Sequence, residues 1–435
     1  MSDLLNFLPF FVLLLVLLAT GTPVAVATAL AAAVGAIMFI GKGALSQLGV
    51  LLFAQASSFV LLMVPLFILM GEALGATRIG RDLFTAAQIW LWRVPGALPI
   101  GTIFSCAGFA AVCGSSPVTA ATIGSVAVPE MIRKGYAARL AFGVTAAGGT
   151  LGIMIPPSVS FILYGIITET SIGALFMAGI GPGLMLVALL SLTVFYLIWR
   201  HPELAPPRSA TIDTSERWTS LRSVLPVTLL IVAVLGSIYT GIATATEAAA
   251  VGAFGALLIA FLLGSLKREV MNRILDNTAR TTAMFVLLVA TGLFSAFVLS
   301  RLGIPQATAQ AITGLDVAPW VVMLAINGLL LILGMFLDPM SILVIVVPIL
   351  FPAVVQLGYD PVWFGVMVTL QIEIAAISPP VGFNLFVLRT VVANARMADI
   401  IRGGLIFIAP MLIGIALLMI FPEIALFLPR MMDLK

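Results

Sequence analysis

Polar residues that could do chemistry interrupt two of the long apolar segments of this sequence. The Gly-Ser-Ser segment 114–116 falls halfway along 95–132, and Asp338 takes the same place in 320–357. A carboxylate within an apolar segment is costly unless it meets a cation, a proton or a polar cavity. Asp338 is therefore the leading candidate functional residue. An ordinary helix kink, which glycine and proline also cause, is the alternative interpretation.

Two Pro-Pro pairs interrupt a further pair of apolar segments, at 156–157 and 379–380. Such a pair removes two amide donors from a helix and frees carbonyl groups that need partners in an apolar environment. The oxygen-bearing side chains near the interruptions are those of Ser115, Ser116, Ser158, Ser160 and Asn384. Oxygen ligands suit a hard cation such as sodium. A proton carried by Asp338 or Glu373 is the alternative.

The other reactive residue types exclude several classes of function. Cys106 and Cys113 share one expected helical face, which indicates packing and not a disulfide or a metal site. His201 is the single histidine, so the sequence offers no histidine metal cluster and no Ser/His/Asp triad. The segment from Gly35 to Lys42 departs from P-loop spacing, and the net charge of +3 is small. Neither a nucleotide nor a nucleic acid is expected as a partner.

The composition places these residues in an integral membrane protein. Hydrophobic residues make up 62% of the chain and charged residues 9%, and the mean hydropathy is +1.22. Runs such as Leu4–Leu18, Leu225–Tyr239 and Phe407–Phe421 have the length of helices and lack charged residues. We therefore expect an all-α polytopic protein that crosses the lipid bilayer many times.

The second half of the sequence repeats the first at an offset of 223 positions. Pro129 returns as Pro352, and the Pro-Pro pairs beginning at 156 and 379 have the same offset. Because proline fixes backbone geometry, this register predicts two units that share a chain path.

The charges predict how these repeats lie in the bilayer. With the N-terminus outside, all but four of the 21 Lys and Arg residues fall inside. The four exceptions are Lys42, Arg301, Arg430 and Lys435. An odd number of predicted spans separates the equivalent loops at Gly135 and Gly358, so these loops face opposite sides. The repeats are therefore predicted to be inverted, as in secondary transporters.

The repeats predict the division of the chain. Each hairpin segment is too long for one span and too short for two, as a re-entrant hairpin would be. In the first half we expect scaffold helices and an inner amphipathic arm in 1–94, followed by transport repeat 1 in 95–199, with a hairpin at 95–132 and a broken helix at 140–165. A cytoplasmic linker is expected in 200–222. In the second half we expect scaffold helices and an outer arm in 223–319, followed by transport repeat 2 in 320–435, with a hairpin at 320–357, a broken helix at 362–388 and a C-terminal helix.

Several motifs, in order along almost the whole chain, are typical of one family. They are Val64-Pro65-Leu66-Phe67, Met70-Gly71-Glu72, Gly114-Ser115-Ser116, Pro129-Glu130-Met131, Ile155-Pro156-Pro157-Ser158, Thr246-Glu247-Ala248-Ala249 and Pro379-Pro380-Val381-Gly382. The chain resembles the large membrane subunit of tripartite ATP-independent periplasmic (TRAP) transporters. The resemblance implies an elevator transporter coupled to the sodium ion. It also implies two partners, a small four-helix membrane subunit and a periplasmic substrate-binding protein that captures organic anions.

The resemblance further implies that the hairpin tips and broken helices hold sodium and substrate. Together with the oxygen-bearing side chains, it gives these candidate ligands: Gly114, Ser115, Ser116, Pro157, Ser158, Ser160, Asp338, Ser378, Pro380, Gly382 and Asn384. The residues that differ from those more usual in the family are Pro117, Gln371, Ala375 and Ser378.

We therefore expect a permease of the bacterial inner membrane that imports a carboxylate-type solute by sodium symport. A stand-alone sodium/divalent-anion symporter with similar hairpins is the alternative. An intramembrane enzyme that uses Asp338 and Glu373 as an acid–base pair is a remote third interpretation. The sequence does not select among carboxylic acids, keto acids, sugar acids and zwitterionic solutes.

Overall fold

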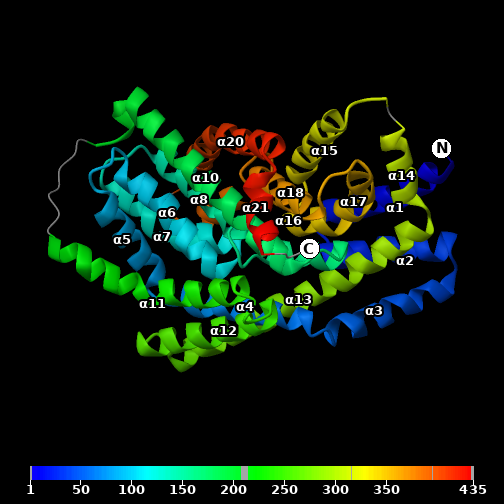
Figure 1. Ribbon diagram of the computed structural model, residues 1–435, viewed down its shortest axis with the longest axis horizontal. Coiled ribbons are helices and arrows are strands. Elements are labelled where there is room, and N and C mark those ends of the chain that lie inside the picture. The colour runs from blue at the N-terminus through cyan, green and yellow to red at the C-terminus, as the bar shows by residue number, and fades with distance from the viewer. Residues whose placement is uncertain (1, 207–213, 315, 394, 433–435) are drawn as a thin grey trace.

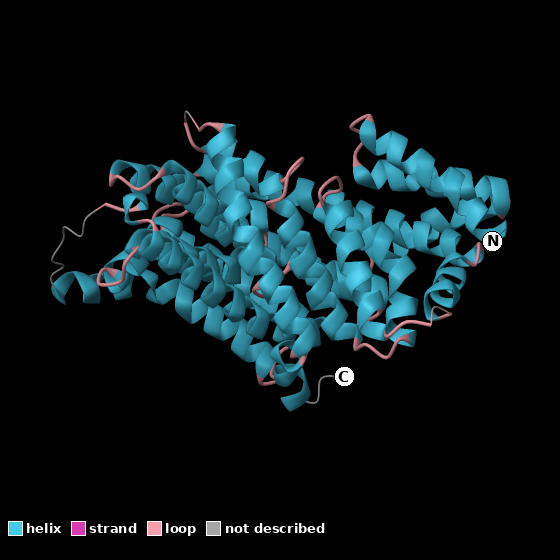
Figure 2. Cartoon of the chain, turned by 90° about the horizontal axis from the view of Figure 1, so that it is seen from above, coloured by secondary structure: helices cyan, strands magenta, loops and turns pink. Residues whose placement is uncertain are grey.

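The computed structural model describes residues 2–206, 214–314, 316–393 and 395–432. Helices joined by short loops make up these parts of the chain, with no strand among them (Figure 2). Six helices are long and apolar enough to cross a membrane, and up to eight spans result if each of two bent helix pairs counts as one. The expectation of an all-α protein with several membrane-spanning helices is confirmed.

The helix bounds recur at the offset seen in the sequence. The first half contains α1 (Ser2–Ala19), α2 (Val24–Phe39), α3 (Ser46–Ala56), α4 (Met63–Gly75), α5 (Ile79–Leu91), α6 (Ala97–Cys113), α7 (Ser116–Arg133), α8 (Ala138–Met154), α9 (Val159–Thr168) and α10 (Ile172–Arg200). The second half contains α11 (Thr214–Tyr239), α12 (Ala245–Leu262), α13 (Arg268–Arg301), α14 (Ile304–Thr313), α15 (Pro319–Gly334), α16 (Pro339–Ser341), α17 (Val347–Gln356), α18 (Pro361–Ala376), α19 (Phe383–Val391), α20 (Met397–Ile420) and a final α21 (Glu423–Met431). Adding 223 to the bounds of α8, 138 and 154, gives 361 and 377, which agree with α18 to within one residue. The inversion of the two copies across a bilayer stays a prediction.

The copies differ most in the helix before the amphipathic arm. In the first copy this segment is divided into α3 and α4, which are bent by 65° at the break between them. In the second copy the equivalent residues form the single 34-residue helix α13. Polar residues at the start of α13 continue the helix beyond its apolar part, with an ion pair of 2.8 Å between Asp276 and Arg280.

The expected linker over 200–222 is partly helical. The chain leaves α10 at Arg200, forms a short 3₁₀ turn over Pro202–Leu204, and enters α11 at Thr214. The linker residues 207–213 lie outside the described residues. The helix includes the end of the expected linker because Thr214–Ser223 contains neither proline nor glycine.

The first halves of the broken helices form the buried centre of the molecule. In α8 every residue from Leu140 to Met154 is buried, and in α18 every residue from Trp363 to Ala376. Helix α8 packs against α6, α7 and α20. In Figure 1 these helices lie above a lower row formed by α11, α12, α4, α13 and α3. We call α1–α4 with α11–α13 the scaffold, and α6–α10 with α15–α20 the transport part.

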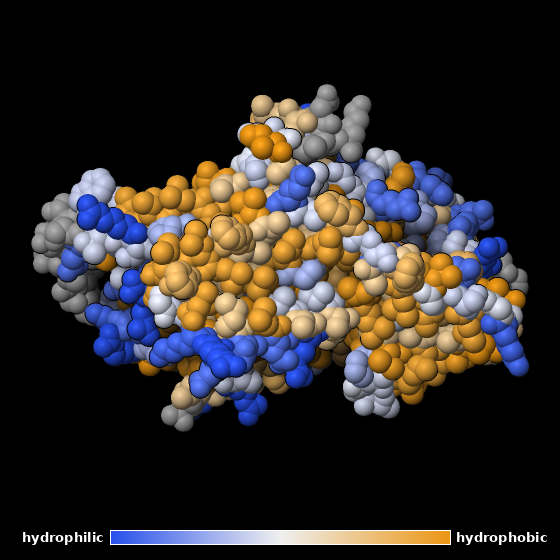
Figure 3. Space-filling model, turned by 90° about the horizontal axis from the view of Figure 1, so that it is seen from below, coloured by the Kyte–Doolittle hydropathy of each residue, from blue (hydrophilic) through white to orange (hydrophobic). Residues whose placement is uncertain are grey.

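The outer surface has the pattern of a membrane protein. Seen from below, the lower row presents a broad apolar area with hydrophilic residues gathered along its edges (Figure 3). Large apolar side chains exposed on this row include Phe254, Phe261 and Leu262 of α12. Hydrocarbon is the solvent that such a surface requires, because exposure of this much apolar area to water is unfavourable.

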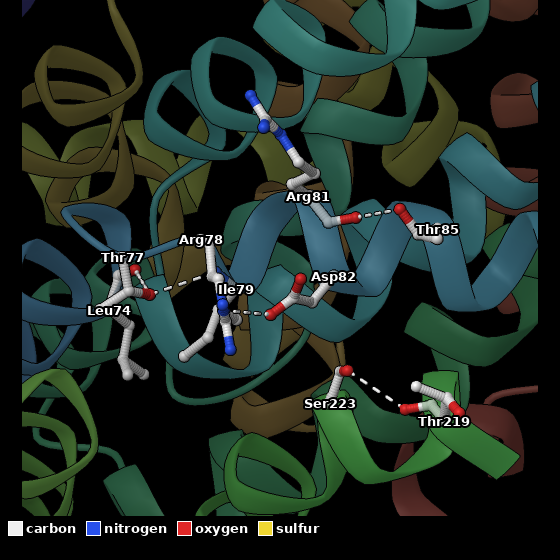
Figure 4. Close-up of polar contacts among 9 residues, drawn as sticks. All are labelled: Leu74, Thr77, Arg78, Ile79, Arg81, Asp82, Thr85, Thr219 and Ser223. Atoms are coloured by element: carbon white, nitrogen blue, oxygen red, sulfur yellow. Dashed lines mark hydrogen bonds and ion pairs between the residues drawn. The ribbon is translucent and has the colours of Figure 1, made fainter. Parts of the chain in front are cut away.

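The arm α5 lies beside α11 and begins with a short polar network (Figure 4). The Thr77 hydroxyl accepts a hydrogen bond from the amide of Ile79 at 3.2 Å and donates one to the Leu74 carbonyl at 2.6 Å. Arg78 lies 3.4 Å from Asp82. Burial raises the pKa of Asp82, although Arg78 and Arg81 act to lower it. These contacts fix the start of the amphipathic arm that the sequence predicted.

Helices α8 and α20 cross with their backbones in contact. A Cβ atom added to Gly403 would lie 2.1 Å from the carbonyl oxygen of Arg139 and 2.8 Å from the amide nitrogen of Gly143. Small residues at such a crossing allow helices to approach closely in the absence of a hydrophobic driving force.

We predict that Gly403→Ala destabilises the protein by about 1–3 kcal/mol, because the added methyl group forces two backbones apart. Thermal unfolding in detergent measures the effect as a lower midpoint. Gly328→Ala in α15 is the matched control, since a Cβ atom there meets nothing within 4 Å. Equal midpoints for the two variants would show that this crossing is not tightly packed.

Candidate functional site

A cavity of about 660 Å³ lies where the transport part meets the scaffold. The tips of both predicted hairpins line it, through residues 114–118 and 336–342. The broken helices contribute Ser160 and Gly382, and the scaffold contributes Glu72 and Thr281. The structure therefore brings six of the candidate ligands to one cavity wall: Gly114, Ser115, Ser116, Ser160, Asp338 and Gly382.

The first hairpin tip packs directly on the first helix break. Gly114 has a φ of +60°, and a Cβ atom there would lie 2.5 Å from the carbonyl oxygen of Pro157. The amide of Val159 donates a hydrogen bond to the Gly114 carbonyl at 3.4 Å. Only glycine meets both requirements, a positive φ and this close approach. The tip and the break therefore hold one another in place.

The second hairpin tip is organised by Asp338 itself. Its carboxylate is the N-cap of α16 and accepts hydrogen bonds from the amides of Met340 at 3.0 Å and Ser341 at 3.3 Å. The Ser341 hydroxyl donates a further hydrogen bond to the same carboxylate. Asp338 lines the cavity while its charge is already engaged in capping.

The two tips consequently differ in what they offer to an anion. At the first tip, Ser115 is the N-cap of α7 and makes no side-chain capping hydrogen bond. The first turn of α7 therefore presents a partial positive charge that no capping side chain offsets. At the second tip the Asp338 carboxylate accepts from the amides of Met340 and Ser341, whose counterparts at the first tip are Pro117, which has no amide proton, and Val118. An anionic group is therefore attracted more strongly to the start of α7 than to the start of α16.

The remaining candidate ligands lie away from the cavity wall. Ser158 is buried and accepts a hydrogen bond from the amide of Phe161 as the N-cap of α9. Ser378 donates to the Ile374 carbonyl at 2.7 Å. Pro157 is buried, whereas Pro380 is exposed. Both Pro-Pro bonds are cis.

The candidate Asn384 is fully buried and belongs to a cluster that joins the two copies. Its amide donates to the hydroxyl of Ser116 at 2.7 Å, and that hydroxyl donates to the carboxylate of Glu373 at 3.2 Å. Ser116 is thus the residue in the cavity wall, with Glu373 and Asn384 behind it.

Glu72 and Glu247 are acids of two family motifs, and the structure gives them different surroundings. Glu247 completes a capping box with Thr244 at the start of α12, which is a structural role. Glu72 lines the cavity and accepts a hydrogen bond from the amide of Asn277 at 3.0 Å. The sequence signal for Glu72 was an acid near the end of an apolar run, and the same signal occurs at Glu247.

Oxygen atoms dominate the chemistry available around the tips. The buried hydroxyl of Ser160 has no hydrogen-bond partner among the described residues. These parts of the chain contain no group of three or more His, Cys, Asp or Glu residues that could hold a metal ion. Hydroxyl, carbonyl and amide oxygens with few carboxylates suit a monovalent hard cation better than a transition metal.

Comparisons with known proteins agree with this architecture. A TM-score of 0.64 relates the structure to the YdaH transporter of Alcanivorax borkumensis, over 89% of this chain and 90% of that one. The sequence identity is 16%, so this likeness concerns the fold alone.

Sequence relatives are closer. The C4-dicarboxylate TRAP transporter large permease protein DctM of Pseudomonas aeruginosa is 35% identical over 92% of this chain and 93% of its own length. The ectoine TRAP transporter large permease protein TeaC of Halomonas elongata is 34% identical over 95% of this chain and 96% of its own length. The isethionate TRAP transporter permease protein DctMQ of Oleidesulfovibrio alaskensis is 35% identical over 94% of this chain, which spans 64% of that longer protein.

The family described as "Tripartite ATP-independent periplasmic transporter, DctM component" matches residues 11–424. This match includes both predicted hairpins, both helix breaks and the scaffold from residue 11 onward. The chain therefore belongs to the DctM component family of TRAP transporters, as its motifs led us to expect.

Proposed function

We propose that this chain is the large permease subunit that imports a small organic anion across the bacterial inner membrane by sodium symport. The observation that carries the proposal is the cavity where both hairpin tips meet the scaffold. Discontinuous helices that point their ends at a shared cavity are the usual way in which a secondary transporter binds solute and ion.

The relatives support a class of substrate and not one compound. Their names include C4-dicarboxylate, isethionate and ectoine at 35%, 35% and 34% identity. Overall identity therefore does not choose among these solutes. The uncapped first turn of α7, beside Ser115, favours an anionic group of the substrate at the first hairpin tip.

Sodium fits the donor atoms at this site. The unpartnered hydroxyl of Ser160 and the carbonyl groups at the helix breaks are neutral oxygen ligands. Bound sodium would supply positive charge next to the substrate, and the hairpin tips would hold both. The candidate ligands that already share the cavity wall are Gly114, Ser115, Ser116, Ser160, Asp338 and Gly382.

An elevator movement would carry this site along the scaffold. In the predicted orientation the cavity opens to the cytoplasm, since two of its exposed lining residues lie on that side: Gly21, which follows α1, and Thr281, where the apolar part of α13 begins. Arg273 and Arg280 on α13 lie at the same end. The described conformation would then be inward-facing, and sliding of the transport part would open the cavity outward.

The alternatives have less support. An enzyme would need Asp338 and Glu373 to act on one substrate, but only Asp338 lines the cavity. A stand-alone symporter would need no partner subunits, whereas the relatives are components of TRAP systems. The DctMQ name of one longer relative is consistent with a small membrane subunit that is fused in some systems and separate in others.

We predict that uptake by the reconstituted complex with its small subunit and binding protein depends on sodium. Replacement of sodium by choline, with a proton gradient imposed across the liposomes, should reduce uptake to background. Undiminished uptake under these conditions would refute sodium coupling and favour a proton.

We predict that this chain alone in liposomes transports little or no substrate, because no described part of it is a soluble module that captures ligand. Addition of the small subunit and the binding protein should restore uptake of radiolabelled substrate. Robust uptake by the chain alone would favour the stand-alone symporter.

We predict that Asp338→Asn lowers uptake about tenfold or more while preserving the fold, because asparagine caps a helix nearly as well but lacks the charge. Asp338→Ala should in addition cost about 0.5–2 kcal/mol of stability through loss of the cap. Uptake and the unfolding midpoint of both variants separate the two roles. Normal transport by Asp338→Asn would leave Asp338 with capping alone.

A further inference from the structure

The hydroxyl of Ser116 joins two buried polar residues of the second copy. Glu373 on α18 and Asn384 on α19 are both 0% exposed, and Ser116 is 3% exposed. Ser116 donates to Oε2 of Glu373 at 3.2 Å and accepts from Nδ2 of Asn384 at 2.7 Å. These are contacts between residues 257 and 268 positions apart, across the two copies.

The single proton of the Ser116 hydroxyl determines the orientation of the amide. Because that proton goes to the Glu373 carboxylate, the hydroxyl can only accept from Asn384, which must present its NH₂ group. The amide oxygen Oδ1 of Asn384 therefore points elsewhere. It has no hydrogen-bond partner among the described residues, and neither has Oε1 of Glu373.

The two unpartnered atoms are both acceptors. Oε1 of Glu373 shares its carboxyl carbon with Oε2, and Oδ1 of Asn384 shares its amide carbon with Nδ2. Since Oε2 and Nδ2 both contact the Ser116 hydroxyl, the two unpartnered oxygens lie near that hydroxyl. None of the ion pairs found in the described parts of the chain involves Glu373. A buried carboxylate with no counter-charge and an unpaired amide oxygen are expensive unless a positively charged ligand joins them.

We propose that Glu373 and Asn384, held by Ser116, form a binding site for a monovalent hard cation. The proposal rests on the sodium coupling proposed above and assigns one ion to a carboxylate behind the cavity wall. Carboxylate and amide oxygens are the ligands that such a cation prefers. The ion would neutralise Glu373 at bilayer depth, where an unpaired charge is unfavourable.

The site belongs to one copy only. The positions equivalent to Glu373 and Asn384, 223 residues earlier, are Thr150 and Phe161. Thr150 makes an ordinary hydrogen bond to the Ala147 carbonyl at 2.6 Å, and Phe161 is an apolar core residue. The fold thus forms at this register without an acid, which argues that Glu373 serves binding and not architecture.

The position of the site explains how an ion would affect substrate binding. Ser116 begins α7 and lines the cavity, whereas Glu373 and Asn384 flank the second helix break. A cation between them would fix the first hairpin tip against the second broken helix. The part of the first hairpin tip that faces the cavity would then be ordered only while the ion is bound. Binding of the ion would in this way favour binding of the substrate.

The test compares thermal unfolding of the purified complex of this chain with its small membrane subunit, in sodium chloride and in choline chloride at equal ionic strength. A ligand that binds the folded state raises the midpoint as its concentration exceeds the dissociation constant. Sodium should raise the midpoint of the wild-type complex. Glu373→Gln keeps an acceptor for Ser116 and removes the charge, so it should be at least as stable without sodium and should lose the sodium-dependent shift.

Glu130→Gln is the matched control. Glu130 lies on α7, the helix that begins at Ser116, and it pairs with Arg133 at the surface. This variant should keep the full sodium-dependent shift. Asn384→Ala provides a second variant if Glu373→Gln does not fold, and it should raise the sodium concentration for half-maximal stabilisation at least tenfold. The same complexes, reconstituted with the binding protein, should show these changes in the sodium dependence of uptake.

An unchanged sodium shift in both Glu373→Gln and Asn384→Ala would overturn this site, while sodium-dependent uptake by the wild type would leave the proposed function intact. Sodium-independent uptake by the wild type would instead refute the proposed function. If acid without sodium stabilises the wild type as much as sodium does, and Glu373→Gln responds to neither, the carboxylate takes a proton and the cation site is wrong.

Discussion

A chain that leaves helical geometry inside an apolar body must provide new hydrogen-bond partners for its backbone. The two helix breaks meet this demand in the same way. At the first break, the amide of Val159 donates to the Gly114 carbonyl, and at the second the amide of Val381 donates to the Met335 carbonyl. Each broken helix is therefore completed by the hairpin of its own copy. The cavity exists because both of these partnerships end beside the scaffold.

A shared backbone frame carries different chemistry in the two copies. The first tip leaves the start of α7 uncapped, whereas the second tip neutralises the same helix end with Asp338. Glu373 and Asn384 occur where the first copy has Thr150 and Phe161. The scaffold is asymmetric as well, with a bend between α3 and α4 that α13 lacks. The two copies thus share the path of the chain, and differences at a few positions give each copy its own polar groups.

Much of the fold could be predicted from the sequence because its signals are local. Proline pairs, glycine and long apolar runs act on the residues beside them, so the helix breaks and the hairpin over 95–132 could be read directly. The bend between α3 and α4 had a weaker signal, the pair Ser57-Ser58 at the break and Pro65 in the first turn of α4. The start of α11 within the expected linker gave no apolar signal, because Thr214–Ser223 is polar and yet helical.

The candidate site could be predicted only in part. The tips and Ser160 were found because polar residues stand out in apolar segments. The capping role of Asp338 had a readable signal, an aspartate directly before a proline at the first helical position. The contact between Ser116 and Glu373 had none, because it joins residues 257 positions apart. Tertiary packing alone creates that part of the site.

The crossing of α8 and α20 has a mechanical consequence. Where Gly143 meets Gly403, backbone touches backbone and no side chain lies between the helices. Side chains can change rotamer and let neighbouring helices slip past one another, but a contact without them has no such compliance. This crossing therefore holds α8 and α20 rigidly together. A displacement of α20 should move α8, the helix that ends at the first break, together with it.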